Sequence, residues 1–212
     1  MPMLVTDPDL ESRLKAQRHE ANSGGHDEVW EGLYIMAPLA NNAHQMIQGR
    51  IVAVLQEVVG WDSPAQVCPG VNLSDREDDW TQNYRDPDVV VFLPGNPAKN
   101  RETHWLGGPD FLVEIISPRD RAREKLDFYA KVGVREALYI DREPWALELY
   151  QLAADRSHMR LSASAPVGGA ECVSSVLPLK FRLVAADTGP KIEITILADA
   201  SGTPGIARRW MI

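Results

Sequence analysis

Residues 43–59 carry apolar side chains at every third or fourth position, which is the spacing of a helix with one buried face. Asn41 or Asn42 can cap the start of this helix, and Gly60 is placed to end it. His44 lies on the same face as the apolar positions, near the start. The pattern therefore predicts one long helix in the first third of the chain.

Strand patterns lie on both sides of this helix. Residues 29–36 predict a strand before it, and residues 65–73 predict a strand after it. The β-branched run 88–93 and the apolar run 111–116 predict two buried strands. Further strands are predicted, some of them from weaker patterns, at 137–140, 145–152, 159–164, 171–176, 181–184 and 191–197.

A second helix is predicted directly after the strand at 111–116. Ser117 can cap it, Pro118 suits its first position, and Asp120 adds an acidic residue to the first turn. Lys131 falls in the last turn, and Gly133 is placed to end the helix. Helices alternating with groups of strands predict an α/β fold, in which helices flank a mixed β-sheet.

The chain has 212 residues, 44% hydrophobic and 25% charged, which is enough for one domain with a proper core. We expect this domain to span residues 29–185. An N-terminal arm at 1–28 would hold a short helix to about Arg18, capped by Thr6 and Asp9. Residues 186–212 would form a C-terminal extension.

The sequence predicts a cytoplasmic protein. No apolar run is long enough to cross a bilayer, and residues 1–7 lack the basic-then-apolar pattern of a secretion signal. Cys68 and Cys172 are far apart and belong to no CxxC motif, so we expect two reduced, buried thiols.

The formal net charge is −8, which argues against a protein that coats nucleic acid nonspecifically. It does not exclude an enzyme that acts on nucleic acid, because a local basic patch can dominate near a site. Residues 119–125 form such a patch. Arg119, Arg121 and Arg123 are its candidates for phosphate contacts, with a solvated helix face as the alternative.

Two carboxylates interrupt the apolar strands, Asp88 at the start of one and Glu114 in the middle of the next. Burying one carboxylate is costly and two neighbouring ones repel, so a bound cation is a natural third partner. Hard oxygen ligands favour Mg²⁺ or Mn²⁺, with the Ile115 carbonyl as a third ligand. Lys125 is the nearest cation that could orient an attacking water, and Tyr129 lies one turn after it.

Each of these residues also has a simpler interpretation. Asp88 could accept backbone N–H groups after a turn, and Glu114 could form a structural salt bridge with Lys125 or Arg85. Glu31 could reach a metal through water, or be a solvated carboxylate. The remaining alternatives are a helix-surface lysine for Lys125, a hydrogen-bonded histidine for His44 and a core residue for Tyr129. Asp88 and Glu114 together, with a cation at a suitable distance, favour the metal site.

Several motifs resemble the PD-(D/E)XK nuclease superfamily, and more narrowly the Uma-type restriction endonucleases of bacteria. They are 85–91 (Arg-Asp-Pro-Asp-Val-Val-Val), 109–118 (Pro-Asp-Phe-Leu-Val-Glu-Ile-Ile-Ser-Pro) and 125–134 (Lys-Leu-Asp-Phe-Tyr-Ala-Lys-Val-Gly-Val), continued at 138–141 and 175–178. The resemblance covers residues 29–184, where Glu31-Gly32 and His44 also fit. Ala137-Leu138 departs from the usual aromatic pair, and the segments 1–27 and 186–212 have no counterpart.

The resemblance implies a restriction-endonuclease-like core and Mg²⁺-dependent hydrolysis of DNA. Asp88 and Glu114 would bind the metal, and Lys125 would be the catalytic lysine. A homodimer is expected, because two cuts in a duplex need two sites. One alternative is a degenerate module that keeps the fold and binds DNA or a protein partner without cutting. Another is a scaffolding protein that assembles through the tail at 208–210.

Overall fold

The computed structural model describes residues 2–20, 26–117, 120–197 and 208–212. Its centre is a six-stranded sheet with the strand order β13-β12-β11-β10-β7-β4. Only β10 and β11 pair in parallel, so the sheet is mixed. Its strands are β4 (Gln66–Pro69), β7 (Val89–Phe92), β10 (Phe111–Ile115), β11 (Glu136–Arg142), β12 (Trp145–Leu152) and β13 (Met159–Pro166).

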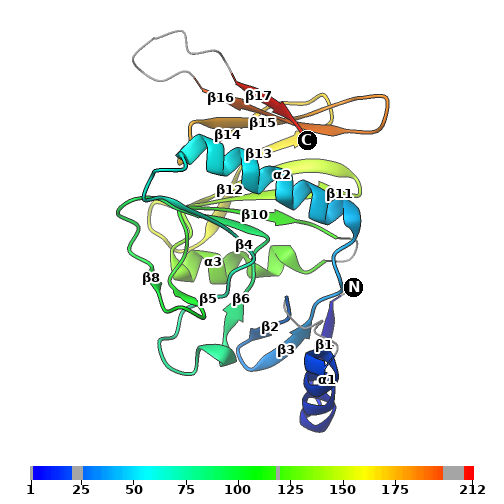
Figure 1. Cartoon of the computed structure of the whole chain (residues 1–212), viewed down its shortest axis with the longest axis vertical. Coiled ribbons are helices and arrows are strands. Elements are labelled where there is room, and N and C mark those ends of the chain that lie inside the picture. Colours follow the sequence, from blue (N-terminus) through cyan, green and yellow to red (C-terminus); the bar gives the residue numbers. More distant parts are fainter. Residues whose placement is uncertain (1, 21–25, 118–119, 198–207) are drawn as a thin grey trace.

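Both faces of this sheet are covered (Figure 1). One face packs against α2 (Asn42–Val59) and against a four-stranded sheet, formed by β14 (Cys172–Val173), β15 (Leu179–Val184), β16 (Lys191–Ile196) and β17 (Arg209–Met211). The other face packs against the 3₁₀ helix η2 (Ala122–Lys125) and α3 (Leu126–Val132). Neighbouring residues of β7 point to opposite faces, so Val89 and Val90 enter different apolar clusters. Burial on both sides explains the unbroken apolar run of this strand.

A second sheet of seven short strands brings the N-terminal segment against the domain. Its order is β1-β3-β2-β6-β5-β9-β8. The strands are β1 (Met3–Val5), β2 (Glu28–Trp30), β3 (Leu33–Met36), β5 (Leu73–Ser74), β6 (Tyr84–Arg85), β8 (Lys99–Asn100) and β9 (Trp105–Leu106), with α1 (Pro8–Glu20) after β1 and the 3₁₀ helix η1 (Trp80–Gln82) after β5. Val5, Val29 and Tyr34 form a small apolar cluster in this region.

The predicted fold class, α/β with helices flanking a mixed sheet, is confirmed. The first long helix has nearly the predicted bounds. The Asn41 side chain caps it by accepting the His44 backbone N–H at 2.9 Å, and the Gly60 N–H closes it on the Gln56 carbonyl. Strand β12 has the predicted bounds.

Several local predictions were wrong. The strand predicted over 65–73 is divided between β4 and β5, which belong to different sheets. The strand predicted over 29–36 is a hairpin, because Glu31 and Gly32 both adopt positive φ and turn the chain between β2 and β3. Helix α1 is capped by Asp7, whose Oδ1 accepts the N–H groups of Asp9 and Leu10, and not by Thr6. The helix predicted from Ser117 begins only at Leu126, because a 3₁₀ turn precedes it.

The C-terminal segment takes part in the four-stranded sheet. Strand β16 pairs with β15 and with β17, and Ile192, Ile194 and Ile212 lie in the larger apolar cluster. The division of the chain at residues 28 and 185 stays a prediction. Cys172 is buried and Cys68 half-buried, and both are free thiols. Within the described ranges, no helix is long and apolar enough to span a membrane.

Candidate active site

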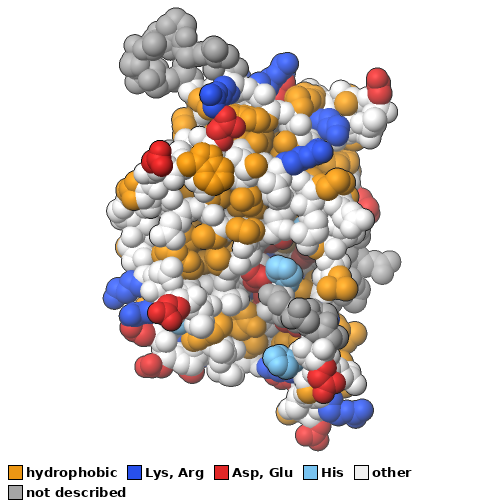
Figure 2. Space-filling view, viewed as in Figure 1, with side chains coloured by type: hydrophobic (Ala, Val, Ile, Leu, Met, Phe, Trp, Pro, Cys, Tyr) orange, Lys and Arg blue, Asp and Glu red, His pale blue; other side chains and the backbone are white. Residues whose placement is uncertain are grey.

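A cleft with a cavity volume of about 100 Å³ lies between β2, the start of α2 and the ends of β7 and β10. Five carboxylates and two Lys or Arg side chains line it, together with His26 and His44. On the face shown in Figure 2, acidic side chains and a histidine meet in a hollow near the middle of the molecule. The carboxylates are Glu28, Asp86, Asp88, Glu114 and Asp120, and the cations are Arg121 and Lys125.

The register of β7 and β10 places Asp88 beside Glu114. The strands are antiparallel with Val89 opposite Val113, so the next pair outward is Asp88 and Glu114. Asp88 Oδ2 accepts the Ile115 N–H at 2.6 Å, and Asp88 Oδ1 lies 2.8 Å from His44 Nε2. The strand ends are thus tied to each other and to α2, and both carboxylates line the same cleft.

Glu114 is buried, and side chains of η2 and α3 bind it. Its Oε1 lies 3.0 Å from Lys125 Nζ and also accepts a hydrogen bond from the Tyr129 hydroxyl. Burial raises the pKa of Glu114 to about 8, and the charges of Asp88 and Glu28 add to that rise, while Lys125 opposes it. The Glu114 carboxyl is therefore a weaker acid than an ordinary glutamate, and a nearby cation favours its charged form.

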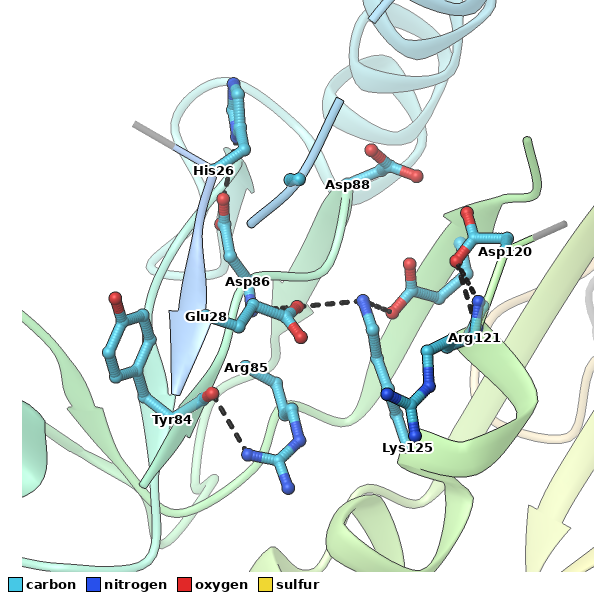
Figure 3. A network of polar contacts seen from close by, with 12 residues as sticks. His26, Glu28, Tyr84, Arg85, Asp86, Asp88, Asp120, Arg121 and Lys125 are labelled. Carbon is cyan, nitrogen blue, oxygen red and sulfur yellow. Dashed lines mark hydrogen bonds and ion pairs between the residues drawn. The ribbon is translucent and has the colours of Figure 1, made fainter. Parts of the chain in front are cut away.

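Lys125 is shared between two carboxylates. Its Nζ lies 2.8 Å from Glu28 Oε1 as well as 3.0 Å from Glu114 Oε1, as Figure 3 shows for Glu28. Burial alone would lower the pKa of Lys125, but Glu114 and Glu28 outweigh it and hold that pKa well above its usual range. Lys125 is therefore a permanent cation at the centre of the cleft.

A histidine–aspartate pair completes the cleft. His26 Nδ1 lies 2.7 Å from Asp86 Oδ2, and the Asp86 backbone N–H donates to Glu28 Oε1 at 2.9 Å (Figure 3). Asp86 is buried, and burial raises its pKa. The contacts run continuously from His26 through Asp86, Glu28 and Lys125 to Glu114.

Most of the predicted site residues meet in or beside this cleft. Asp88, Glu114, Ile115, Lys125 and His44 line it, and Tyr129 contacts Glu114 from behind. The contacts expected from the simpler interpretations are also present: Asp88 accepts a backbone N–H, and Glu114 forms an ion pair with Lys125. These contacts and a functional role are compatible.

Two predicted residues lie elsewhere. Glu31 sits at the turn of the β2–β3 hairpin, where Arg76 binds it at 2.6 Å, and it is not among the residues that line the cleft. Arg123 is held by Glu148 at 2.9 Å and Asp141 at 3.0 Å, so its charge is already engaged. Arg121 lines the cleft and pairs with Glu124. Arg119 falls outside the described residues.

Sequence reasoning missed Glu28, Asp86 and His26. Glu28 lies one residue before the strand predicted over 29–36 and Glu31 lies within it, and the hairpin turn at Glu31 is what separates their positions. The signal that was available is the Glu31-Gly32 dipeptide, which is typical of a tight turn. Asp86 was visible beside Asp88, in the same Asp-Pro-Asp motif.

A metal ion at this cleft would have few protein ligands. Across the described parts of the chain, no group of three or more His, Cys, Asp or Glu side chains is arranged to hold an ion. The available donors are the carboxylates of Asp88 and Glu114 and the Ile115 carbonyl. This set of hard oxygens fits Mg²⁺, which is commonly held by one or two carboxylates, water and substrate phosphates.

The fold and the cleft define an α/β protein of the restriction-endonuclease-like class. Residues 14–185 match the Uma2 family, which is described as "Putative restriction endonuclease", and the chain belongs to this family. Among solved structures, one similar chain is that of "a putative nuclease belonging to DUF820" from Anabaena variabilis. The two share 23% sequence identity with a TM-score of 0.49, over 59% of this chain and 71% of that chain. No curated protein matches this chain.

Proposed function

We propose that this protein is a metal-dependent endonuclease that hydrolyses phosphodiester bonds of DNA in the bacterial cytoplasm. One observation carries the proposal: carboxylates from two adjacent strands line one cleft beside a buried lysine. The family description supports nuclease activity in general. DNA as substrate, Mg²⁺ or Mn²⁺ as cofactor and a homodimer as the working form are the finer parts of the proposal.

Asp88 and Glu114 would hold the ion, with the Ile115 carbonyl as a third donor. The chemistry that Mg²⁺ or Mn²⁺ supplies at such a site is polarisation of the phosphate and a lower pKa for water. Within the described residues, the second carboxylate oxygen of Glu114 has no hydrogen-bond partner, so it is free to bind a cation. Glu114 would bind the ion in its deprotonated form.

Lys125 would orient the attacking water and offset negative charge in the transition state. Its ammonium group has three N–H donors, and Glu28 and Glu114 occupy two of them. The third can donate to water or to a phosphate oxygen. Because its pKa lies well above the usual range, Lys125 acts as a cation and not as a proton acceptor.

Tyr129 would be a positioning residue. Its hydroxyl donates to Glu114, and burial holds the pKa of Tyr129 well above its usual range, so it remains a donor at any physiological pH. Together with Lys125, it fixes one oxygen of Glu114. This contact leaves the other oxygen facing the site.

The charge of the cleft favours an enzyme over a module that only binds DNA. Five carboxylates against two cations would repel a phosphate backbone unless a metal ion offset them. A binding module gains nothing from this arrangement. A metal-dependent hydrolase would use two of these carboxylates, Asp88 and Glu114, as metal ligands.

A plasmid-nicking assay with Mg²⁺ or Mn²⁺ tests the proposal. We expect wild type to nick, and Glu114→Gln and Lys125→Met to lose about 10²- to 10³-fold in rate. Two matched controls should keep activity. Glu136→Gln changes a buried carboxylate on β11 that is held by Ser175 and Gln151 outside the cleft, and Lys131→Met changes a lysine of α3 that is held by Asp75.

The same assay separates the alternatives. Nicking that persists in Glu114→Gln and Lys125→Met would place the activity elsewhere and overturn the assignment. DNA binding without nicking, unchanged in both variants, would identify a binding module. Linear product formed directly from the supercoiled plasmid would support two sites acting together in a dimer.

A further inference from the structure

His26 and Asp86 form a pair that the proposed hydrolysis does not use. The Asp86 side chain is only 4% exposed, whereas the His26 side chain is 59% exposed at the mouth of the cleft. A buried carboxylate thus holds one nitrogen of a ring that faces solvent. Within the described residues, the other ring nitrogen, Nε2, makes no hydrogen bond.

Glu28 and Gly70 restrict the positions of Asp86 and His26. The Asp86 N–H donates to Glu28 Oε1, which fixes the carboxylate from behind. Gly70 packs beside the ring with φ of +52°, where a Cβ atom would lie 3.3 Å from His26 Cε1 and 3.5 Å from Asp86 Oδ1. The Gly70 N–H donates to the Asp88 carbonyl at 3.1 Å, so this turn is also tied to the proposed metal ligand. Any residue with a side chain would press on the histidine.

His26 lies close in sequence to a residue at the centre of the cleft. It lies two residues before Glu28, which binds Lys125, and both side chains line the cleft. Figure 3 shows the run of contacts from His26 through Asp86 and Glu28 to Lys125. His26 and Lys125 line the same cleft, so one extended ligand in the cleft can contact both.

The groups that face His26 are acidic. They are Asp86, Asp88 and Asp27, and the hydrogen bond to Asp86 raises the pKa of His26 in spite of its partial burial. A larger share of the ring is therefore charged near neutral pH than for an ordinary histidine. The charged ring has an Nε2–H that can donate to an anion, in a cleft where carboxylates outnumber cations.

We propose that His26 is a substrate-binding residue whose Nε2–H donates a hydrogen bond to a phosphate oxygen of the nucleic acid, with Asp86 as the positioning residue that orients the ring. This inference rests on the proposed function, because it takes a nucleic acid as the ligand. It adds a contact outside the reacting centre. His26 should therefore affect binding more than the chemical step.

Binding of a short DNA duplex in Ca²⁺, followed by fluorescence anisotropy, tests the inference. Ca²⁺ is a hard cation that fills oxygen sites with looser geometry than Mg²⁺. At about pH 6, we expect His26→Gln to raise Kd about 3- to 10-fold and to lower the salt slope of binding by about 0.9. Towards about pH 8.5 the His26 imidazole loses its proton, so the ratio of the variant Kd to the wild-type Kd should fall towards one. This ratio cancels the pH dependence of metal binding at Glu114, which both proteins share.

Two further variants sharpen the test. His158→Gln changes an exposed histidine at the β12–β13 turn, outside the cleft, and should bind like wild type. Asp86→Asn keeps the size of the side chain and removes its charge, so it should shift the pH dependence of binding to lower pH. In nicking assays, His26→Gln should raise KM more than it lowers kcat.

The outcomes separate this inference from the proposed function. Wild type that nicks DNA, with unchanged binding and pH dependence in His26→Gln, would overturn the inference alone. Binding that depends on His26 without any nicking would overturn the hydrolase and keep the inference. A wild-type protein that neither binds nor cuts DNA would overturn both.

Discussion

Replacing Lys125 by methionine should destabilise the protein more than the same change at Lys131, the other lysine of η2 and α3. The change removes one cation from between Glu28, at 2.8 Å, and Glu114, at 3.0 Å. These three side chains are at most 10% exposed, so water replaces the lost partner only poorly. Removing one member of a buried ion pair costs about 3–5 kcal/mol, and we expect a loss in this range.

Urea unfolding at about pH 7, extrapolated linearly to water, measures this loss. The matched control is Lys131→Met in the same helical region. Lys131 Nζ lies 2.5 Å from Asp75, but its side chain is 59% exposed, so its loss should cost less than about 1 kcal/mol.

The loss should also grow as pH rises past about 8. Lys125 is the main influence that lowers the Glu114 pKa, so without it that pKa rises above about 8. Above about pH 8, Glu114 then keeps its proton in the folded variant but has lost it in folded wild type. In both unfolded chains Glu114 is already deprotonated at this pH. Stability therefore falls more steeply with pH in the variant. A loss no larger than that of Lys131→Met, or one that shrinks as pH rises, would refute this account of Lys125.

Two other expectations follow from the same geometry. In the absence of DNA, the affinity for Mn²⁺ should rise about 25-fold between about pH 6.5 and about pH 8.5, because Glu114, with a pKa of about 8, must lose its proton to solvent before it can bind the metal. Calorimetric titration measures this, and Glu114→Gln should abolish the pH dependence. Arg123→Ala should leave the salt slope of DNA binding unchanged, since Glu148 and Asp141 already hold Arg123. A slope reduced by about 0.9 would show a phosphate contact.

The sequence contains enough information to predict the centre of the site. A carboxylate within an apolar strand signals that the group has a partner, and both Asp88 and Glu114 stand out for that reason. The capping pattern at 117–120 and Gly133 locate a helical segment, which places Lys125 near Glu114. The apolar runs at 88–93 and 111–116 are both buried strands, so the sheet follows from pattern alone.

Local turn geometry explains most of what sequence reasoning missed. The hairpin at Glu31-Gly32 turns Glu28 towards Lys125 and takes Glu31 away from the cleft, and alternation within one long strand cannot show this. The side chain of Asp120 accepts the N–H groups of Arg121 and Ala122, so the chain forms a 3₁₀ turn before the helix starts. The pairing of His26 with Asp86 joins residues sixty positions apart, which no local pattern reports.

The central claim is that Asp88 and Glu114 share one metal ion, and a crystal soaked in Mn²⁺ tests it most directly. The account predicts one anomalous-density peak at about 2.0–2.3 Å from an oxygen of each carboxylate, lost in Glu114→Gln. The absence of an anomalous-density peak from the cleft, or a peak that contacts neither carboxylate, would contradict the account.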